Sequence, residues 1–97
     1  MLPIEEKKYD FLQFRFTGNS KKSYPYAYIH SIKQHVDESY TDIIEFEYAK
    51  INFKLKGQCL NSLDEKIQNR KLNVIHLTTE EEATYHPHKP LVWEVEV

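Results

Sequence analysis

Residues 43–55 read IIEFEYAKINFKL, and their pattern is the clearest indication of the fold. Alternate positions are apolar, first at even numbers and then at odd numbers: Ile44, Phe46, Tyr48, Ile51, Phe53 and Leu55. Because strand side chains alternate between two faces, the change of parity predicts a reversal of the chain or a bulge. A two-residue turn at Ala49-Lys50 would pair Phe46 with Phe53, and a four-residue connection would pair Phe46 with Ile51. Ala-Lys is poor chemistry for a tight type I′ turn, so the longer connection or a bulge competes with it.

The other face of this hairpin carries opposite charges on its two strands. Glu45 and Glu47 lie on the first strand, and Lys54 and Lys56 lie on the second. Cross-strand pairs such as Glu45 with Lys54 would contribute about 0.2–1 kcal/mol each, and less where solvent screens them. This pattern predicts an ordinary solvated sheet face.

Three other segments have the alternation or composition of strands. They are the segment around Leu12, Phe14 and Phe16, the segment Val74, Ile75 and Leu77, and the C-terminal segment from Leu91 to Val97. Residues 23–36 combine two periods, since tyrosines alternate at its start and isoleucines follow at helical spacing. We predict an extended start there, with one short helical turn before His35, and leave open whether the segment is strand or part helix.

One helix is predicted at about residues 62–72, after the fourth strand. Ser62 and Glu65 fit a capping box, and Leu60, Leu63 and Ile67 form a narrow apolar stripe. The helix is expected to end by Asn73. Residues 78–90 form a polar connection without core residues. Together the segments predict an α+β domain with a predominantly antiparallel, twisted sheet of five or six strands, either open or closed into a partial barrel.

Composition limits the classes of function. The chain has 97 residues, a length typical of one domain, and residues 1–8 read as a loose lead-in. A net charge of -2 disfavours broad binding to nucleic acid or to an anionic membrane. The sequence holds no apolar span of membrane length, and its single cysteine, Cys59, cannot form an internal disulfide. A cytoplasmic location is therefore expected, with Cys59 as a small buried side chain.

A tyrosine-rich segment suggests one candidate binding surface. Tyr24, Tyr26 and Tyr28 follow Lys21 and Lys22 in the sequence. Alternating aromatic rings beside basic side chains can stack the bases of single-stranded nucleic acid. The same spacing is more typical of tyrosines that cover a sheet face, so nucleic-acid binding is the alternative hypothesis here.

His86 and His88 are the candidate metal ligands. Two imidazoles two residues apart in an extended loop could meet one ion, with Glu80–Glu82 nearby in the sequence. A structural site needs four ligands, and the spacing matches no zinc signature. Exposed loop histidines are the simpler interpretation.

Catalysis is not indicated by any motif. The chain has no HExxH, C-x-x-C or G-x-S-x-G pattern. If the protein were an enzyme, the first residues to mutate would be His30, His35 and Cys59. The sequence indicates no cofactor. The preferred interpretation is a small non-catalytic module for protein interaction or assembly. Its unknown partner, or a second copy of the chain, would pair with the strand at 91–97 if that strand lies at a sheet edge.

Overall fold

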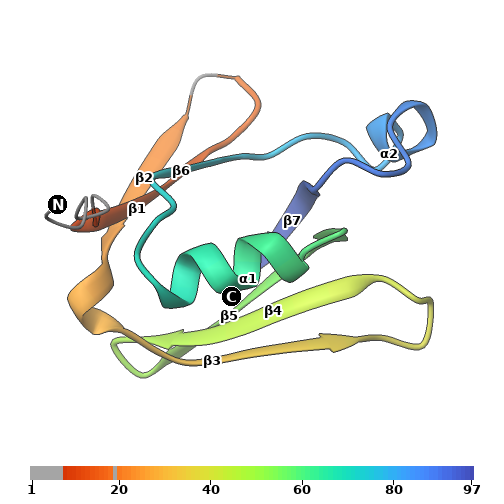
Figure 1. Ribbon diagram of the computed structural model, residues 1–97. Coiled ribbons are helices and arrows are strands. Elements are labelled where there is room, and N and C mark those ends of the chain that lie inside the picture. Colours follow the sequence, from red (N-terminus) through yellow and green to blue (C-terminus); the bar gives the residue numbers. More distant parts are fainter. Residues whose placement is uncertain (1–7, 19) are drawn as a thin grey trace, which may run out of the picture.

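The computed structural model describes residues 8–18 and 20–97, and these residues form an α+β fold (Figure 1). Its strands and helices are β1 (Phe11–Arg15), β2 (Lys21–Pro25), the 3₁₀ helix η1 (Tyr26–Tyr28), β3 (Ile29–Val36), β4 (Asp42–Tyr48), β5 (Ile51–Gln58), α1 (Asn61–Gln68), β6 (Val74–His76), α2 (Glu82–Tyr85) and β7 (Leu91–Glu96). The predicted fold class and the predominance of antiparallel pairing are confirmed. No helix in the described ranges has the length and apolar character needed to cross a membrane.

The strands make two sheets, where the sequence predicted one. Within the described chain, one sheet has the order β2-β1-β6 and the other has the order β3-β4-β5-β7. The predicted count of five or six strands in a single sheet is therefore wrong, and neither sheet closes into a barrel. The physical reason is the crossing made by α1, which carries the chain from β5 to the far side of the core, so that β6 pairs with β1 in parallel.

A single core joins both sheets to α1. Leu60, immediately before α1, and Ile67 of α1 are buried in it. The inner faces of the sheets supply its other fully buried side chains, each at most 2% exposed: Leu12, Phe14, Ile44, Phe46, Leu55 and Val92. In Figure 1, α1 lies between the two sheets, and its Ile67 belongs to the core cluster that holds residues of both sheets. Burial of one such aliphatic or aromatic side chain contributes about 1.5–3 kcal/mol.

The hairpin of β4 and β5 turns tightly. Phe46 is paired with Phe53, and their rings stack with centroids 5.2 Å apart. Ala49 and Lys50 form the whole connection, with φ values of 49° and 69°. Both residues are thus left-handed, as a type I′ turn requires, although neither is glycine or asparagine. The packing of six apolar side chains on one face selects the register despite the cost of this turn.

Helix α1 is shorter than predicted, and its ends use other chemistry. It spans Asn61–Gln68, and no side-chain capping bond forms at its start, so the predicted capping box is wrong. The Asp42 carboxylate of β4 instead accepts the Leu60 amide at 3.1 Å. At the other end Arg70 has a φ of 56°, and the Lys71 amide bonds to the Lys66 carbonyl at 2.8 Å. This left-handed stop ends the helix before Asn73.

The ambiguous segment 23–36 is extended apart from one short helical turn. That turn, η1, comes immediately after Pro25 and not just before His35, since Pro25 ends β2. The polar connection contains α2, a helix that the sequence did not predict because it buries no side chain. Nearly all of the predicted lead-in, residues 1–8, lies outside the described residues.

Candidate functional site

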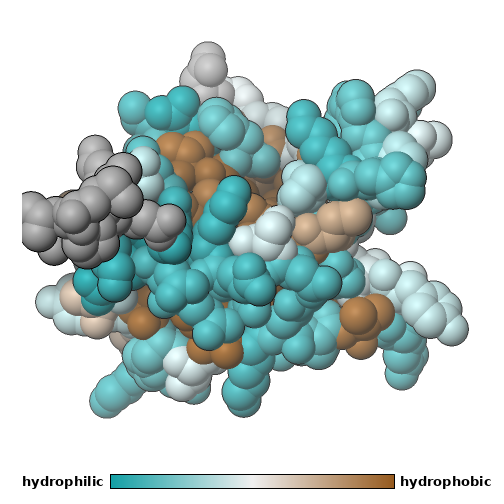
Figure 2. Space-filling model, in the orientation of Figure 1, coloured by the Kyte–Doolittle hydropathy of each residue, from teal (hydrophilic) through white to brown (hydrophobic). Residues whose placement is uncertain are grey.

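A hollow of about 510 Å³ lies beside β6, between that strand, α1 and the segment that leads from α2 into β7. Figure 2 shows an apolar area in the middle of this face, bordered by hydrophilic residues. The volume falls within the usual range for sites that hold a small molecule or a short peptide segment.

The backbone of β6 defines one wall of this hollow. Parallel pairing to β1 uses the Asn73 carbonyl, which accepts from Gln13 at 2.9 Å, and the Leu77 amide, which donates to Arg15 at 2.8 Å. Since backbone groups alternate along a strand, the amides of Val74 and His76 point to the opposite edge. Among the described residues no strand lies there, apart from one isolated bridge between Leu77 and Val92. Amides of β6 therefore face the hollow without a strand partner.

The same row of amides shows what this edge can bind. The Thr78 amide, next in the row after Val74 and His76, donates to the Val92 carbonyl of β7 at 2.9 Å. One end of the hollow is therefore closed by a strand-type hydrogen bond between β6 and β7. In the described residues this pairing does not continue toward Val74, which lines the open part of the hollow. An extended backbone bound in this open part would pair with β6 and so continue the pairing that begins at Thr78.

The side walls of the hollow are apolar and its rim is polar. Leu63 of α1, Leu77 and Leu91 are half-buried around it. Glu82, His86 and Lys89 lie at the rim, where the His86 Nε2 is 3.8 Å from a Glu82 carboxylate oxygen. This combination can hold apolar side chains inside and place polar groups at one end.

Residues at the end of β5 hold the rim in place. The Gln58 side-chain amide donates to the carbonyls of His86 at 2.6 Å and Lys89 at 2.9 Å. Gly57 allows β7 to approach, since a Cβ built on it would lie 1.9 Å from the Leu91 carbonyl oxygen. The far wall of the hollow thus depends on a close contact between two backbones.

The predicted tyrosine and lysine surface is divided by the structure. Tyr26 is 3% exposed, and its hydroxyl donates to the Leu72 carbonyl at 2.6 Å. Burial raises the pKa of Tyr26 to about 12, and burial also raises the pKa of Tyr24, whose ring packs edge-on against Phe53. Tyr28 remains 60% exposed. The three rings thus do not form one open stacking face.

Lys21 and Lys22 lie on opposite faces of the sheet. Lys21 is paired with Arg15 and Lys22 with Phe14, and neighbouring positions on a strand alternate in direction. The five residues predicted to act together are therefore not brought together.

The predicted metal ligands lie in different surroundings. His86 borders the hollow, whereas His88 is an exposed loop residue outside its lining. Within residues 8–18 and 20–97, no three His, Cys, Asp or Glu side chains are grouped so that they could hold an ion. Cys59 was expected to be buried but is exposed, because its left-handed backbone (φ 54°) turns it out of the sheet at the end of β5.

The sequence left open whether the C-terminal strand lies at an edge or inside its sheet, and the structure places β7 last in its sheet in the described part of the chain. Sequence reasoning missed the edge of β6. A strand of three residues gives a weak sequence signal. That β6 pairs with a strand on only one side in the described chain follows from the path of the chain through α1, which brings β6 next to β1.

Comparisons of the chain with known protein families, with curated proteins and with solved structures find no match. Function must therefore be argued from the site alone.

Proposed function

We propose that this protein is a non-catalytic binding module that takes up an extended segment of another protein along the free edge of β6. The observation that carries the proposal is the row of amides on Val74 and His76, which face a half-apolar hollow where the described chain provides no strand partner. An added strand supplies backbone acceptors at the spacing of these two amides.

The shape of the hollow favours a peptide over a flat protein surface. Its volume of about 510 Å³ can admit a few extended residues, and Leu63 and Leu91 are among the residues that line it. In an added strand, every second side chain would point into the hollow and the side chains between them would point to solvent. We therefore expect a partner segment of three or four residues with apolar side chains at every second position.

A peptide selection tests this function without knowledge of the natural partner. A random twelve-residue peptide library is selected on the immobilised full chain, and one selected peptide is titrated into ¹⁵N-labelled protein. The expected result is chemical-shift change centred on Val74, His76 and Leu77. Failure to select any peptide, or shifts centred on another surface, would overturn the proposal.

Two variants at one position separate backbone pairing from side-chain contact. Val74→Pro removes the amide that faces the hollow but leaves the hydrogen bonds to β1, whereas Val74→Ala removes only side-chain volume. One lost hydrogen bond of about 1.4 kcal/mol corresponds to a tenfold loss of affinity. Val74→Pro should therefore weaken the peptide about tenfold and Val74→Ala less than threefold. Equal effects of the two variants would contradict strand addition.

A second copy of the chain is the competing occupant. Dilution of the free protein distinguishes it, because self-association at β6 would change the Val74 and His76 signals with protein concentration. We expect those signals to be independent of concentration. A concentration-dependent change confined to them would replace the proposed partner with self-association.

A further inference from the structure

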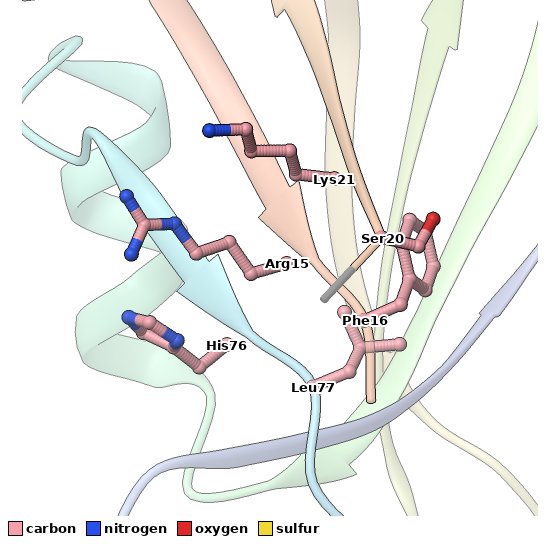
Figure 3. Close-up of a pocket in the computed structure, with 6 residues that line it drawn as sticks. All are labelled: Arg15, Phe16, Ser20, Lys21, His76 and Leu77. Atoms are coloured by element: carbon pink, nitrogen blue, oxygen red, sulfur yellow. The ribbon is translucent and has the colours of Figure 1, made fainter. Parts of the chain in front are cut away.

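Three basic side chains lie in a row across the three-stranded sheet. Arg15 on the central strand β1 is paired with Lys21 of β2 on one side and with His76 of β6 on the other. Figure 3 shows all three side chains extending to the same side of the sheet. They border a hollow of about 410 Å³ that also includes Ser20. This hollow is distinct from the hollow of about 510 Å³ beside β6, hereafter the β6 groove, although His76 and Leu77 border both.

Among the described residues the row has no acidic partner, in contrast to the other sheet. There, Lys56 lies 3.0 Å from Glu96 and 3.6 Å from Glu94, and Lys54 lies 3.9 Å from Glu45. No carboxylate in residues 8–18 and 20–97 pairs with the row of Arg15, Lys21 and His76. Like charges directly opposite each other on neighbouring strands destabilise a sheet. An anion bound between them would remove this repulsion.

The Arg15 guanidinium is also oriented for a ligand. Its Nε donates to the Gln13 side-chain oxygen at 2.9 Å, and the Gln13 nitrogen donates in turn to the Ser23 hydroxyl at 3.2 Å. Gln13 and Ser23 are a cross-strand pair on the same face of the sheet. This chain of hydrogen bonds fixes the Nε side of the guanidinium and leaves its terminal nitrogens available, the arrangement that suits a planar fork on an oxyanion.

We propose that Arg15, Lys21 and His76 form a binding site for a phosphate monoester group. A monoester carries nearly two negative charges and three acceptor oxygens at neutral pH, which match two permanent cations and one imidazole in a small hollow. A nucleic-acid strand fits less well, because it needs a longer basic track and open aromatic faces, whereas Tyr24 and Tyr26 are packed against the core. The site does not depend on the proposed peptide groove.

Titration of the full chain with inorganic phosphate tests the site. The signals of the Arg15 Nε–H group and of the Lys21 and His76 amides are expected to shift and to saturate at millimolar phosphate. O-phosphoserine should shift the same signals. Acetate, a monoanion, should need at least a tenfold higher concentration. Equal responses to acetate and phosphate would overturn the assignment to a phosphate group.

Matched variants locate the effect. Arg15→Gln should raise the half-saturation concentration at least tenfold, and Lys21→Gln should raise it several-fold. Lys54→Gln, an equal loss of charge on the other sheet, should leave it within twofold. An Arg15→Gln half-saturation concentration within twofold of that of wild type would overturn the site. An oligothymidylate that shifts the same signals at a hundredfold lower concentration than phosphate would overturn the monoester in favour of nucleic acid.

Discussion

Replacement of Gly57 by alanine should destabilise the fold and displace one wall of the β6 groove. A Cβ at this position would lie 1.9 Å from the Leu91 carbonyl oxygen and 3.0 Å from the Val92 Cα, and both are backbone atoms that cannot rotate away. β7 would have to retreat by about 1.1 Å to bring the first contact to 3.0 Å. Overpacking of this kind costs about 1–3 kcal/mol, and we expect about 3 kcal/mol because the obstacle is backbone.

Thermal and urea unfolding, followed by circular dichroism, measure this loss. For a chain of this length, about 3 kcal/mol corresponds to a fall in Tm of roughly 15 °C. Gly18→Ala is the matched control, since Gly18 has a φ of 87° and no atom within 4 Å of the built Cβ. Strain alone should cost Gly18→Ala about 1 kcal/mol. A Gly57→Ala variant no less stable than Gly18→Ala would refute the close approach of β5 and β7.

Three further predictions concern backbone strain and pH. Lys50→Gly should stabilise the fold by about 0.5–1 kcal/mol, because relief of the strain at the left-handed φ of 69° exceeds the conformational entropy that glycine loses on folding. The control Lys66→Gly, at an exposed position of α1, should destabilise the fold by about 1 kcal/mol. A lower Tm for Lys50→Gly than for wild type would contradict strain in the turn. Arg70→Gly should likewise raise the urea midpoint, since Arg70 occupies the left-handed position after α1, and an unchanged midpoint would show that this position is not strained. Tyr26→Phe should cost about 1 kcal/mol at pH 7 through the lost bond to Leu72. In the unfolded chain the Tyr26 phenol loses its proton near pH 10, whereas in the folded protein it does so only near its pKa of about 12. The stability difference between wild type and Tyr26→Phe, measured by urea unfolding, should therefore shrink between pH 10 and pH 12. A difference that stays constant over this range would argue against burial of the hydroxyl.

The hairpin and the fold class could be predicted from the sequence because both depend on local periodicity. Apolar side chains at two-residue spacing place one face of a strand toward the core. Phe46 pairs with Phe53, which is one of the two registers that the sequence predicted. Local turn chemistry was the weaker guide. Ala49 and Lys50 disfavour a tight turn, yet the turn forms because burial of Ile44, Phe46, Phe53 and Leu55 outweighs the strain of two residues.

The division into two sheets depends on long-range contacts that no spacing encodes. Nothing in the three residues of β6 indicates a parallel partner 61 positions earlier, as Val74 is to Gln13. The candidate sites follow from the same cause. Arg15 and His76 meet only because β6 lies beside β1, so neither the basic row nor the open β6 edge could be found by motif.

Amide hydrogen exchange at β6 is the measurement that tests the proposed groove most directly. We expect the amides of Val74 and His76 to exchange rapidly in the free protein, and the amide of Ile75, which faces β1 in the ladder, to be protected. Addition of a selected peptide should slow Val74 and His76 at least tenfold and leave Ile75 unchanged. Protection of Val74 and His76 in the free protein, or no slowing on peptide binding, would contradict the claim that this edge is a binding site for an added strand.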